Sequence, residues 1–182
     1  MTAPALLIRP STPADLPAIT AIYAQAVLHG TGTFELDPPD LAEMSRRRDD
    51  VLSKGLPWLV AQERGHADAP VLGYAYANHF RPRKAYRFCL EDSIYLHPDA
   101  RGRGVGKLLL AELVARCEAA GARQMLAVIG DAENAGSIGV HAALGFSHTG
   151  VLKSSGWKFD RWLDVVLMQR SLGTGASTPG SD

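Results

Sequence analysis

Apolar and polar positions alternate along the chain in blocks that predict strands and helices in turn. An apolar run over residues 5–11 is typical of a strand. The turn after it, Thr12-Pro13-Ala14-Asp15, favours a helix start, because it offers a hydroxyl cap, a proline for the first turn and an acid for the positive end. Apolar residues then recur at helical spacing as far as Val27. The chain is therefore predicted to begin with a strand and an amphipathic helix.

A second helix is expected over residues 40–52, after a pair of prolines. Its apolar residues Leu41, Met44 and Leu52 are expected to face inward. The arginine run 46–48 is expected to form a solvated outer face, because a run of charge normally lies in water.

The rest of the chain alternates between strand-like and helix-like segments. Two more helices are expected to begin near Val105 and Asn134 and to end at Gly121 and Gly145. The strand-like segments are 58–61, 71–76, 89–96, 124–129, 146–151 and 162–169. The order β-α-α-β-β-β-α-β-α-β-β predicts a mixed α/β or α+β fold.

Length and composition limit the classes of protein that fit. A chain of 182 residues suits one domain, placed here at 1–172, followed by a Gly-, Ser-, Thr- and Pro-rich tail, 173–182, expected to be disordered. The 19 basic residues balance the 19 acidic ones, so the charge does not call for nucleic acid or a membrane surface. No apolar stretch is long enough for a membrane span, no basic leader precedes the first apolar run, and Cys89 and Cys117 suggest no disulfide framework. A cytoplasmic location is expected.

A glycine-rich turn, Arg101-Gly102-Arg103-Gly104-Val105-Gly106-Lys107, sits between an expected strand and a long expected helix. Glycines let backbone N–H groups approach a phosphate, and the helix start adds about half a positive charge. A Walker A loop does not fit, because the outer glycines are one residue too close and Leu108 follows the lysine. A dinucleotide fingerprint fits poorly, because its third glycine comes early and no acid lies at 122–124. A solvated glycine turn remains the structural alternative.

The pattern that remains, [RQ]-x-x-G-x-[GA], resembles the pyrophosphate-binding signature of the GNAT acetyltransferases. A second feature of that superfamily, N-x-x-[AS] followed by G-[FY], runs from Asn134 to Phe146. The resemblance implies the GNAT fold, a central, mixed, mostly antiparallel twisted sheet flanked by helices, and acetyl-CoA as co-substrate. The residues it implies in cofactor binding are Ile94, Tyr95, Leu96, Arg101, Gly102, Arg103, Gly104, Val105, Gly106, Lys107, Asn134 and Ser137.

The likeness is closer still to the phosphinothricin and methionine sulfoximine acetyltransferases, over residues 7–172. Segments that resemble motifs of that family are 33–34, 57–61, 73–77, 127–130, 141–146 and 162–165. The resemblance implies a homodimer with active sites near the subunit interface, and an amino-acid-like substrate such as methionine sulfoximine, methionine sulfone or phosphinothricin.

Acetyl transfer from a thioester to an amine needs a neutral amine, a polarised carbonyl and a proton for the departing thiolate. Glu91 matches the general-base glutamate of the family, and His141 stands where many GNAT enzymes carry a tyrosine acid. Both are the implied catalytic residues, and the sequence does not separate the base role from the acid role. A backbone N–H near 94–96 is expected to polarise the carbonyl.

The segment 80–86 offers cations and an aromatic ring just before Glu91, which suits an oxyanion on the substrate. The resemblance implies Phe34, Arg81, Arg83, Tyr86 and Glu91 in substrate binding. Phe80 and Pro82 depart from the phosphinothricin enzymes, so the preferred substrate stays open.

Three other functions remain to be weighed. Acetylation of a peptide amino terminus is open, whereas a polyamine substrate conflicts with the cations at Arg81, Arg83 and Lys84. A catalytically silent acyl-CoA-binding module would not need Glu91 and His141. The histidines show no metal-ligand spacing, and no metal is expected.

Overall fold

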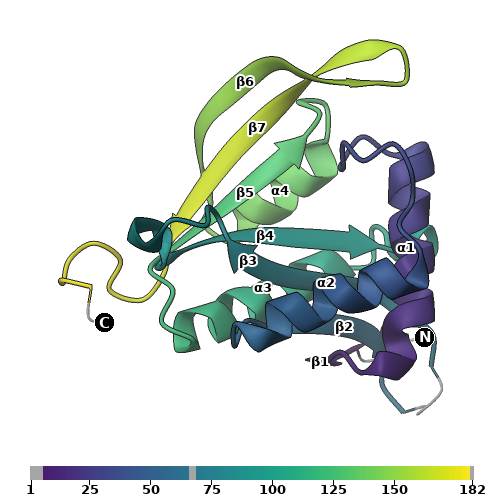
Figure 1. Ribbon diagram of the computed structural model, residues 1–182, viewed down its shortest axis with the longest axis horizontal. Coiled ribbons are helices and arrows are strands. Elements are labelled where there is room, and N and C mark those ends of the chain that lie inside the picture. Colours follow the sequence, from purple (N-terminus) through teal and green to yellow (C-terminus); the bar gives the residue numbers. More distant parts are fainter. Residues whose placement is uncertain (1–5, 66–68, 181–182) are drawn as a thin grey trace.

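A seven-stranded sheet runs through the molecule in the order β1-β2-β3-β4-β5-β7-β6 (Figure 1). This computed structural model describes residues 6–65 and 69–180. All neighbouring strands are antiparallel except β4 and β5, which are parallel. The expected mixed, mostly antiparallel sheet with flanking helices is confirmed.

The elements follow the order that the hydrophobic pattern predicts. The strands are β1 (Leu6–Pro10), β2 (Trp58–Glu63), β3 (Val71–His79), β4 (Cys89–Leu96), β5 (Gln124–Gly130), β6 (Ser147–Lys158) and β7 (Arg161–Ser171). The helices are α1 (Leu16–His29), α2 (Leu41–Ser53), α3 (Val105–Ala119) and α4 (Ala135–Ala143). Strand β6 continues well past the expected end at residue 151, because it pairs with β7 in a long hairpin.

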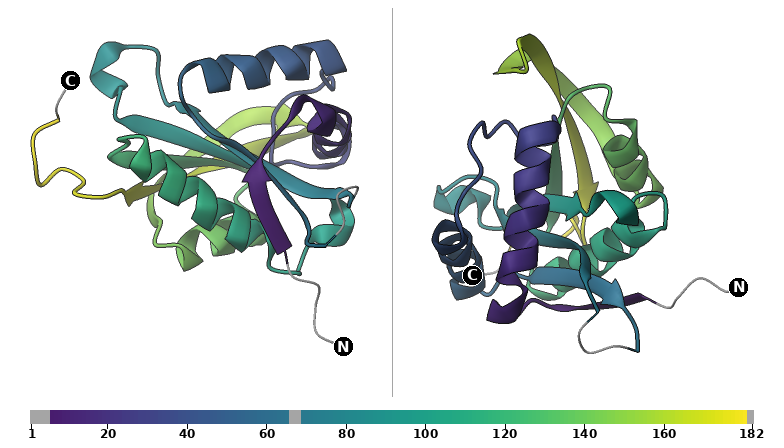
Figure 2. Two further views of the ribbon diagram at one scale, coloured as in Figure 1. Left: turned by 90° about the horizontal axis from the view of Figure 1, so that it is seen from below. Right: turned by 90° about the vertical axis from the view of Figure 1, so that its right-hand side faces the viewer.

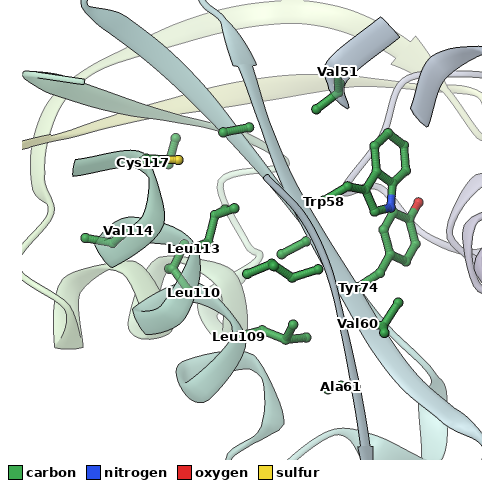
Figure 3. Packing of buried hydrophobic residues seen from close by; sticks show 14 of the residues in the cluster. Val51, Trp58, Val60, Ala61, Tyr74, Leu109, Leu110, Leu113, Val114 and Cys117 are labelled. Atoms are coloured by element: carbon green, nitrogen blue, oxygen red, sulfur yellow. The ribbon is translucent and has the colours of Figure 1, made fainter. Parts of the chain in front are cut away.

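Helices cover both faces of the sheet. Helices α1 and α2 lie on one face, and α3 and α4 on the other (Figure 2). Figure 3 shows Leu109 and Leu113 of α3 on one side of the central strands, and Trp58 and Tyr74 on the other. These side chains are almost fully buried, so one sheet holds together two apolar layers.

The inner face of α2 differs from the prediction. Met44 and Val51 are buried, whereas Leu41 and Leu52 are largely exposed. Arg48, expected in solvent, is 8% exposed, because it shares the inward stripe with Met44 and Val51 at helical spacing. Its guanidinium donates to Ser11 Oγ at 2.8 Å and to the Ser11 carbonyl oxygen at 2.6 Å. Arg48 therefore joins α2 to the end of β1.

The end of the chain also differs from the expected disorder. Residues 173–180 follow a series of turns across the surface. The Arg123 guanidinium donates to Thr174 Oγ1, to Thr178 Oγ1 and to the carbonyl oxygens of Gly175 and Pro179. Composition could not indicate this anchor, since it lies some fifty residues earlier in the chain.

Residues 1–5 and 66–68 of the expected domain, which include the start of the first expected strand, and residues 181–182 of the expected tail lie outside the described residues. Across the described ranges, no helix has the length and apolar character needed to cross a bilayer.

Candidate active site

Strands β4 and β5 are paired over only half of their length and then separate, and we call the point of separation the fork. Their parallel pairing runs from Cys89 opposite Gln124 to Asp92 opposite Ala127 and goes no further. Strand β4 nevertheless continues to Leu96 and β5 to Gly130. Backbone groups on the facing edges of this fork are left without a ladder, and buried backbone groups require hydrogen-bond partners. An extended ligand bound at the fork can therefore form backbone hydrogen bonds with these strands, as a neighbouring strand would.

The glycine-rich turn lies between the end of β4 and the start of α3. Gly102 and Gly104 adopt left-handed conformations with φ of 72° and 78°, which a residue with a side chain rarely adopts. Helix α3 starts at Val105, so its first N–H groups have no helical acceptor and favour an anion.

The cations of this turn lie at the surface. Arg101 and Lys107 are exposed. The Arg103 guanidinium contacts the Glu63 carboxylate of β2 at 2.5 Å, so Arg103 is held across the sheet edge. A phosphate group at this turn can therefore interact with the exposed Arg101 and Lys107, whereas Arg103 is already paired with Glu63.

The first turn of α4 is built on a cap. Asn134 Oδ1 accepts a hydrogen bond from the Ser137 N–H at 3.2 Å. One turn further on, the Ser137 carbonyl oxygen lies 2.7 Å from His141 Nδ1. The two cofactor residues expected on this helix and the expected catalytic histidine thus belong to one chain of hydrogen bonds.

That chain of hydrogen bonds ends on β4, at Asp92, a residue outside every sequence motif named above. His141 Nε2 lies 2.9 Å from Asp92 Oδ2, and both side chains are 2% exposed. Burial by itself lowers the pKa of His141, but the hydrogen bond and the charge of Asp92 outweigh it, so that the pKa is raised. No local pattern marks Asp92, because its partner is 49 residues away.

Glu91 faces the other side of the sheet. Successive strand side chains alternate, so Glu91 shares a face with Tyr95, whose ring meets Tyr23 of α1 at 4.9 Å. Burial raises the pKa of Glu91, Arg81 opposes the rise and Asp92 adds to it. The two expected catalytic residues therefore lie on opposite faces of β4. Glu91 points toward α1, and His141 approaches the other face from α4.

The cationic segment 80–86 lies at the surface between β3 and β4. Arg81, Arg83 and Tyr86 are all exposed. The Arg81 guanidinium lies 4.4 Å above the Phe80 ring, which also meets Tyr86 edge-on at 5.7 Å. Only Arg81 of these three acts on the ionisation of Glu91 in the described structure.

The Phe34 ring packs closely against glycines of two strands. A side chain at Gly156 of β6 would collide with the Phe34 ring, and one at Gly130 of β5 would collide with the Thr31 carbonyl oxygen and lie 3.1 Å from that ring. Next to it, Lys158 is 3% exposed and donates from Nζ to the Thr33 carbonyl oxygen at 2.8 Å. Burial lowers the pKa of Lys158. No sequence pattern marks this lysine, since 125 residues separate it from Thr33.

Within the described ranges, no group of three or more histidine, cysteine, aspartate or glutamate side chains could hold a metal ion. Cys89 and Cys117 are both free thiols.

Comparison with known proteins gives consistent results. Residues 24–146 match the acetyltransferase (GNAT) family. The chain is 58% identical over 164 residues to a phosphinothricin N-acetyltransferase of Alcaligenes faecalis, covering 90% of this chain and 81% of that protein. It is 41% identical over 172 residues to an L-methionine sulfoximine/L-methionine sulfone acetyltransferase of Pseudomonas aeruginosa, covering 94% and 98%.

A similar solved structure is that of a GNAT superfamily phosphinothricin acetyltransferase from Sinorhizobium meliloti in complex with AcCoA. The TM-score is 0.92 at 50% sequence identity, over 97% of this chain and 94% of that one. The fork, the glycine turn and the α4 cap thus occur in a chain whose whole fold is shared with that protein.

Proposed function

The chain belongs to the GNAT family of acetyltransferases and uses acetyl-CoA, and we propose that its acceptor is the amine of a small amino-acid-like molecule. Methionine sulfoximine, methionine sulfone and phosphinothricin are the acceptors that the names of its relatives suggest. The observation that carries the proposal is Glu91: a half-buried carboxylate of raised pKa beside the fork, within the electrostatic reach of Arg81.

The residues around the fork fit acetyl-CoA. The left-handed Gly102 and Gly104, the free start of α3 and the exposed Arg101 and Lys107 suit its pyrophosphate. Backbone groups of β4 over 94–96, on the edge that faces β5, can form hydrogen bonds with the amide groups of acetyl-CoA. Acetyl-CoA supplies an activated thioester, and everything else in the reaction falls to residues of this chain.

Glu91 acts as the general base in this proposal. An amino acid reaches the enzyme mainly as an ammonium ion, and it must lose a proton before its nitrogen can attack a carbonyl carbon. A carboxylate whose pKa lies above the ordinary range accepts a proton more readily than a solvated one. The face of β4 that carries Glu91 is therefore assigned to the amine.

His141 is assigned to the other side of the fork, where the thiolate departs. Its ring approaches from α4, on the face of the sheet opposite to Glu91. This arrangement gives base and acid separate faces of one strand, a division that the sequence leaves open. A backbone N–H on β4 over 94–96 is proposed to polarise the thioester carbonyl.

The acceptor is proposed to bind between the segment 80–86 and the loop that carries Phe34. Arg81 and Arg83 offer forked donors to a carboxylate, phosphinate or sulfone oxygen, and Tyr86 adds an exposed ring. Phe34 supplies an apolar wall fixed by Gly130 and Gly156.

Thiol release from acetyl-CoA across a panel of amines tests the proposal. The panel contains methionine sulfoximine, methionine sulfone, phosphinothricin, common amino acids, short peptides and spermidine. Saturable turnover confined to the first three supports the proposed acceptor. Preference for a peptide or for spermidine contradicts it, and acetyl-CoA binding without turnover points to a silent binding module.

We also propose that the enzyme is a homodimer that pairs through the hairpin β6–β7. Strand β6 is the sheet edge, and Trp162 is 62% exposed. The large exposed apolar residues of this hairpin are Val151, Leu152, Trp157, Phe159 and Trp162. Because Lys158 contacts the Phe34 loop, an interface here lies beside the acceptor site. Sedimentation of the wild type as a dimer and of Trp162→Ser as a monomer supports this, and a monomeric wild type contradicts it.

Two coarser features of the proposal concern the chain as a whole. We propose one catalytic domain over residues 1–172, supported by a single sheet that takes in every strand from β1 to β7. A cytoplasmic location is supported by the two free thiols, Cys89 and Cys117, which suit a reducing compartment.

A further inference from the structure

Among the ion pairs of the described residues, Asp92 and His141 have the least exposed side chains, at 2% each. His141 Nδ1 lies 2.7 Å from the Ser137 carbonyl oxygen, which can only accept. Nδ1 therefore carries a proton. His141 Nε2 lies 2.9 Å from a carboxylate oxygen of Asp92, and this contact too needs a proton between its two atoms.

The pair consequently keeps one proton more than a neutral histidine beside a carboxylate. Either the ring is an imidazolium next to a carboxylate, or a neutral ring faces a protonated Asp92. The raised pKa of His141 favours the imidazolium. Buried charges persist when they are paired and hydrogen-bonded, and here each side chain is 2% exposed.

The position of the pair links it to the fork. Asp92 is the last residue of β4 that is paired with β5. His141 lies one turn after Ser137, which is bonded to the Asn134 cap. The pair therefore fastens the last turn of α4 to the point where the two strands separate, and the Ser137 carbonyl oxygen connects it to the capped first turn.

One acceptor of Asp92 remains unused. Among the described residues, its Oδ1 has no hydrogen-bond partner although it is buried. A buried polar atom without a partner costs about 1–3 kcal/mol. Asp92 Oδ1 can thus accept one more hydrogen bond at the fork while Oδ2 stays bonded to His141.

The surroundings of the pair contain few other titratable groups. Cys117 of α3 feels the charge of Asp92, and burial raises the pKa of this thiol to about 12, so it stays neutral near neutral pH. Glu91 is the neighbour across the strand. The carbonyl oxygen and hydroxyl of Ser137 on α4 contact the His141 ring, and the Phe146 ring meets the imidazole edge-on at 5.0 Å.

We infer that Asp92 is a positioning residue for acetyl transfer, which holds His141 doubly protonated and fixed at the fork. The inference rests on the proposed function, since it concerns the positive charge that His141 holds on the side of the departing thiolate. Asp92 itself acts through the histidine and need not touch either substrate.

Asp92→Asn tests the inference with almost no change of shape. The amide can donate to Nε2, which then must be unprotonated, so the ring becomes neutral with its proton on Nδ1. Nitrogen-15 spectra of histidine-labelled protein distinguish the two states without any substrate. In the wild type at about pH 8, where an ordinary histidine is neutral, both nitrogens of His141 are expected to carry protons. In the variant only Nδ1 is expected to do so.

Kinetics supply the second readout. The kcat of Asp92→Asn is expected to fall about tenfold or more, because misplaced or wrongly charged groups at a site carry penalties of that order, with the KM for acetyl-CoA changed much less. Asp49→Asn on α2, an exposed aspartate, is the matched control and should leave kcat and the His141 spectrum unchanged.

Several results overturn the inference. One is a wild-type His141 that titrates near pH 6.5 like a solvated histidine, as the spectra alone can reveal even if the variant folds poorly. Another is a variant with altered His141 protonation but unchanged kcat per folded molecule. If the wild type acetylates no amine, the proposed function fails, while the spectra still decide whether Asp92 holds the proton on His141.

Discussion

Two consecutive residues of β4, Glu91 and Asp92, lie on opposite faces of the sheet. Glu91 points toward α1, and Asp92 points toward α4 and His141. Alternation of side chains along a strand is sufficient to separate them. The proposed base, Glu91, and Asp92, the partner of His141, can therefore differ in charge and hydration although they are neighbours in the chain.

Glu91→Gln removes the proposed base without changing its shape. We expect kcat/KM to fall about a hundredfold, the usual order for loss of a positioned base. Because burial raises the pKa of Glu91, wild-type activity should be lost as the pH falls through a value above that of an ordinary glutamate. The variant should lack this acid limb. A pH–rate profile measures both, with Glu112→Gln on the surface of α3 as the control.

The same substitution should leave stability intact or improve it. A raised pKa means that folding favours the protonated carboxyl, so ionisation at neutral pH opposes the folded state. Glutamine carries no charge. Thermal unfolding at about pH 7 should give Glu91→Gln a melting temperature at least as high as that of the wild type. A lower one, together with lost activity, would indicate a structural role for Glu91.

At the scale of elements, α2 is fixed by a buried cation as well as by apolar residues. Arg48→Ala removes two hydrogen bonds to Ser11 and leaves a gap between Met44 and Val51. We expect the free energy of unfolding to fall by about 2 kcal/mol, the order for charged hydrogen bonds. Arg46→Ala, an exposed neighbour paired with Glu43, should leave the denaturation midpoint nearly unchanged. Equal midpoints for the two variants would contradict this account of Arg48.

The hairpin β6–β7 and the loop before α2 meet around the Phe34 ring. Gly156→Ala places a methyl group where that ring lies, so the ring must shift. We expect the KM for the acceptor to rise several-fold while the KM for acetyl-CoA stays the same. Gly150→Ala on the same strand meets open space and serves as the control. Unchanged acceptor kinetics in Gly156→Ala would remove Phe34 from the acceptor wall.

At the scale of the whole molecule, the Asp92–His141 pair should appear in the pH dependence of stability. The pKa of His141 is raised by folding, so the stabilisation is complete below about pH 6.5 and is lost as the pH rises through the folded value. The free energy of unfolding of the wild type relative to Asp92→Asn should therefore be most favourable near pH 6 and decline toward pH 9. Urea denaturation across this range measures it, and a flat difference would count against the buried imidazolium.

The sequence by itself determined the order of the elements, the glycine turn and the α4 cap. Each depends on residues close together in the chain: periodic apolar positions, glycines that reach left-handed conformations, and Asn134 three residues before its partner Ser137. Glu91 could also be named as a candidate from the sequence, because the motif and the strand pattern that point to it are both local. Its face of the sheet follows from alternation once one neighbour's contact is known.

Only the tertiary structure decided which side chains meet. Arg48 with Ser11, His141 with Asp92, and Lys158 with Thr33 are 37, 49 and 125 residues apart. The run of arginines favoured solvent, and Asp92 and Lys158 gave no signal, because polar side chains are usually solvated. What buries them is the packing of helices on both faces of one sheet. A buried polar group must find its partner wherever the fold supplies one, and local periodicity carries no record of that position.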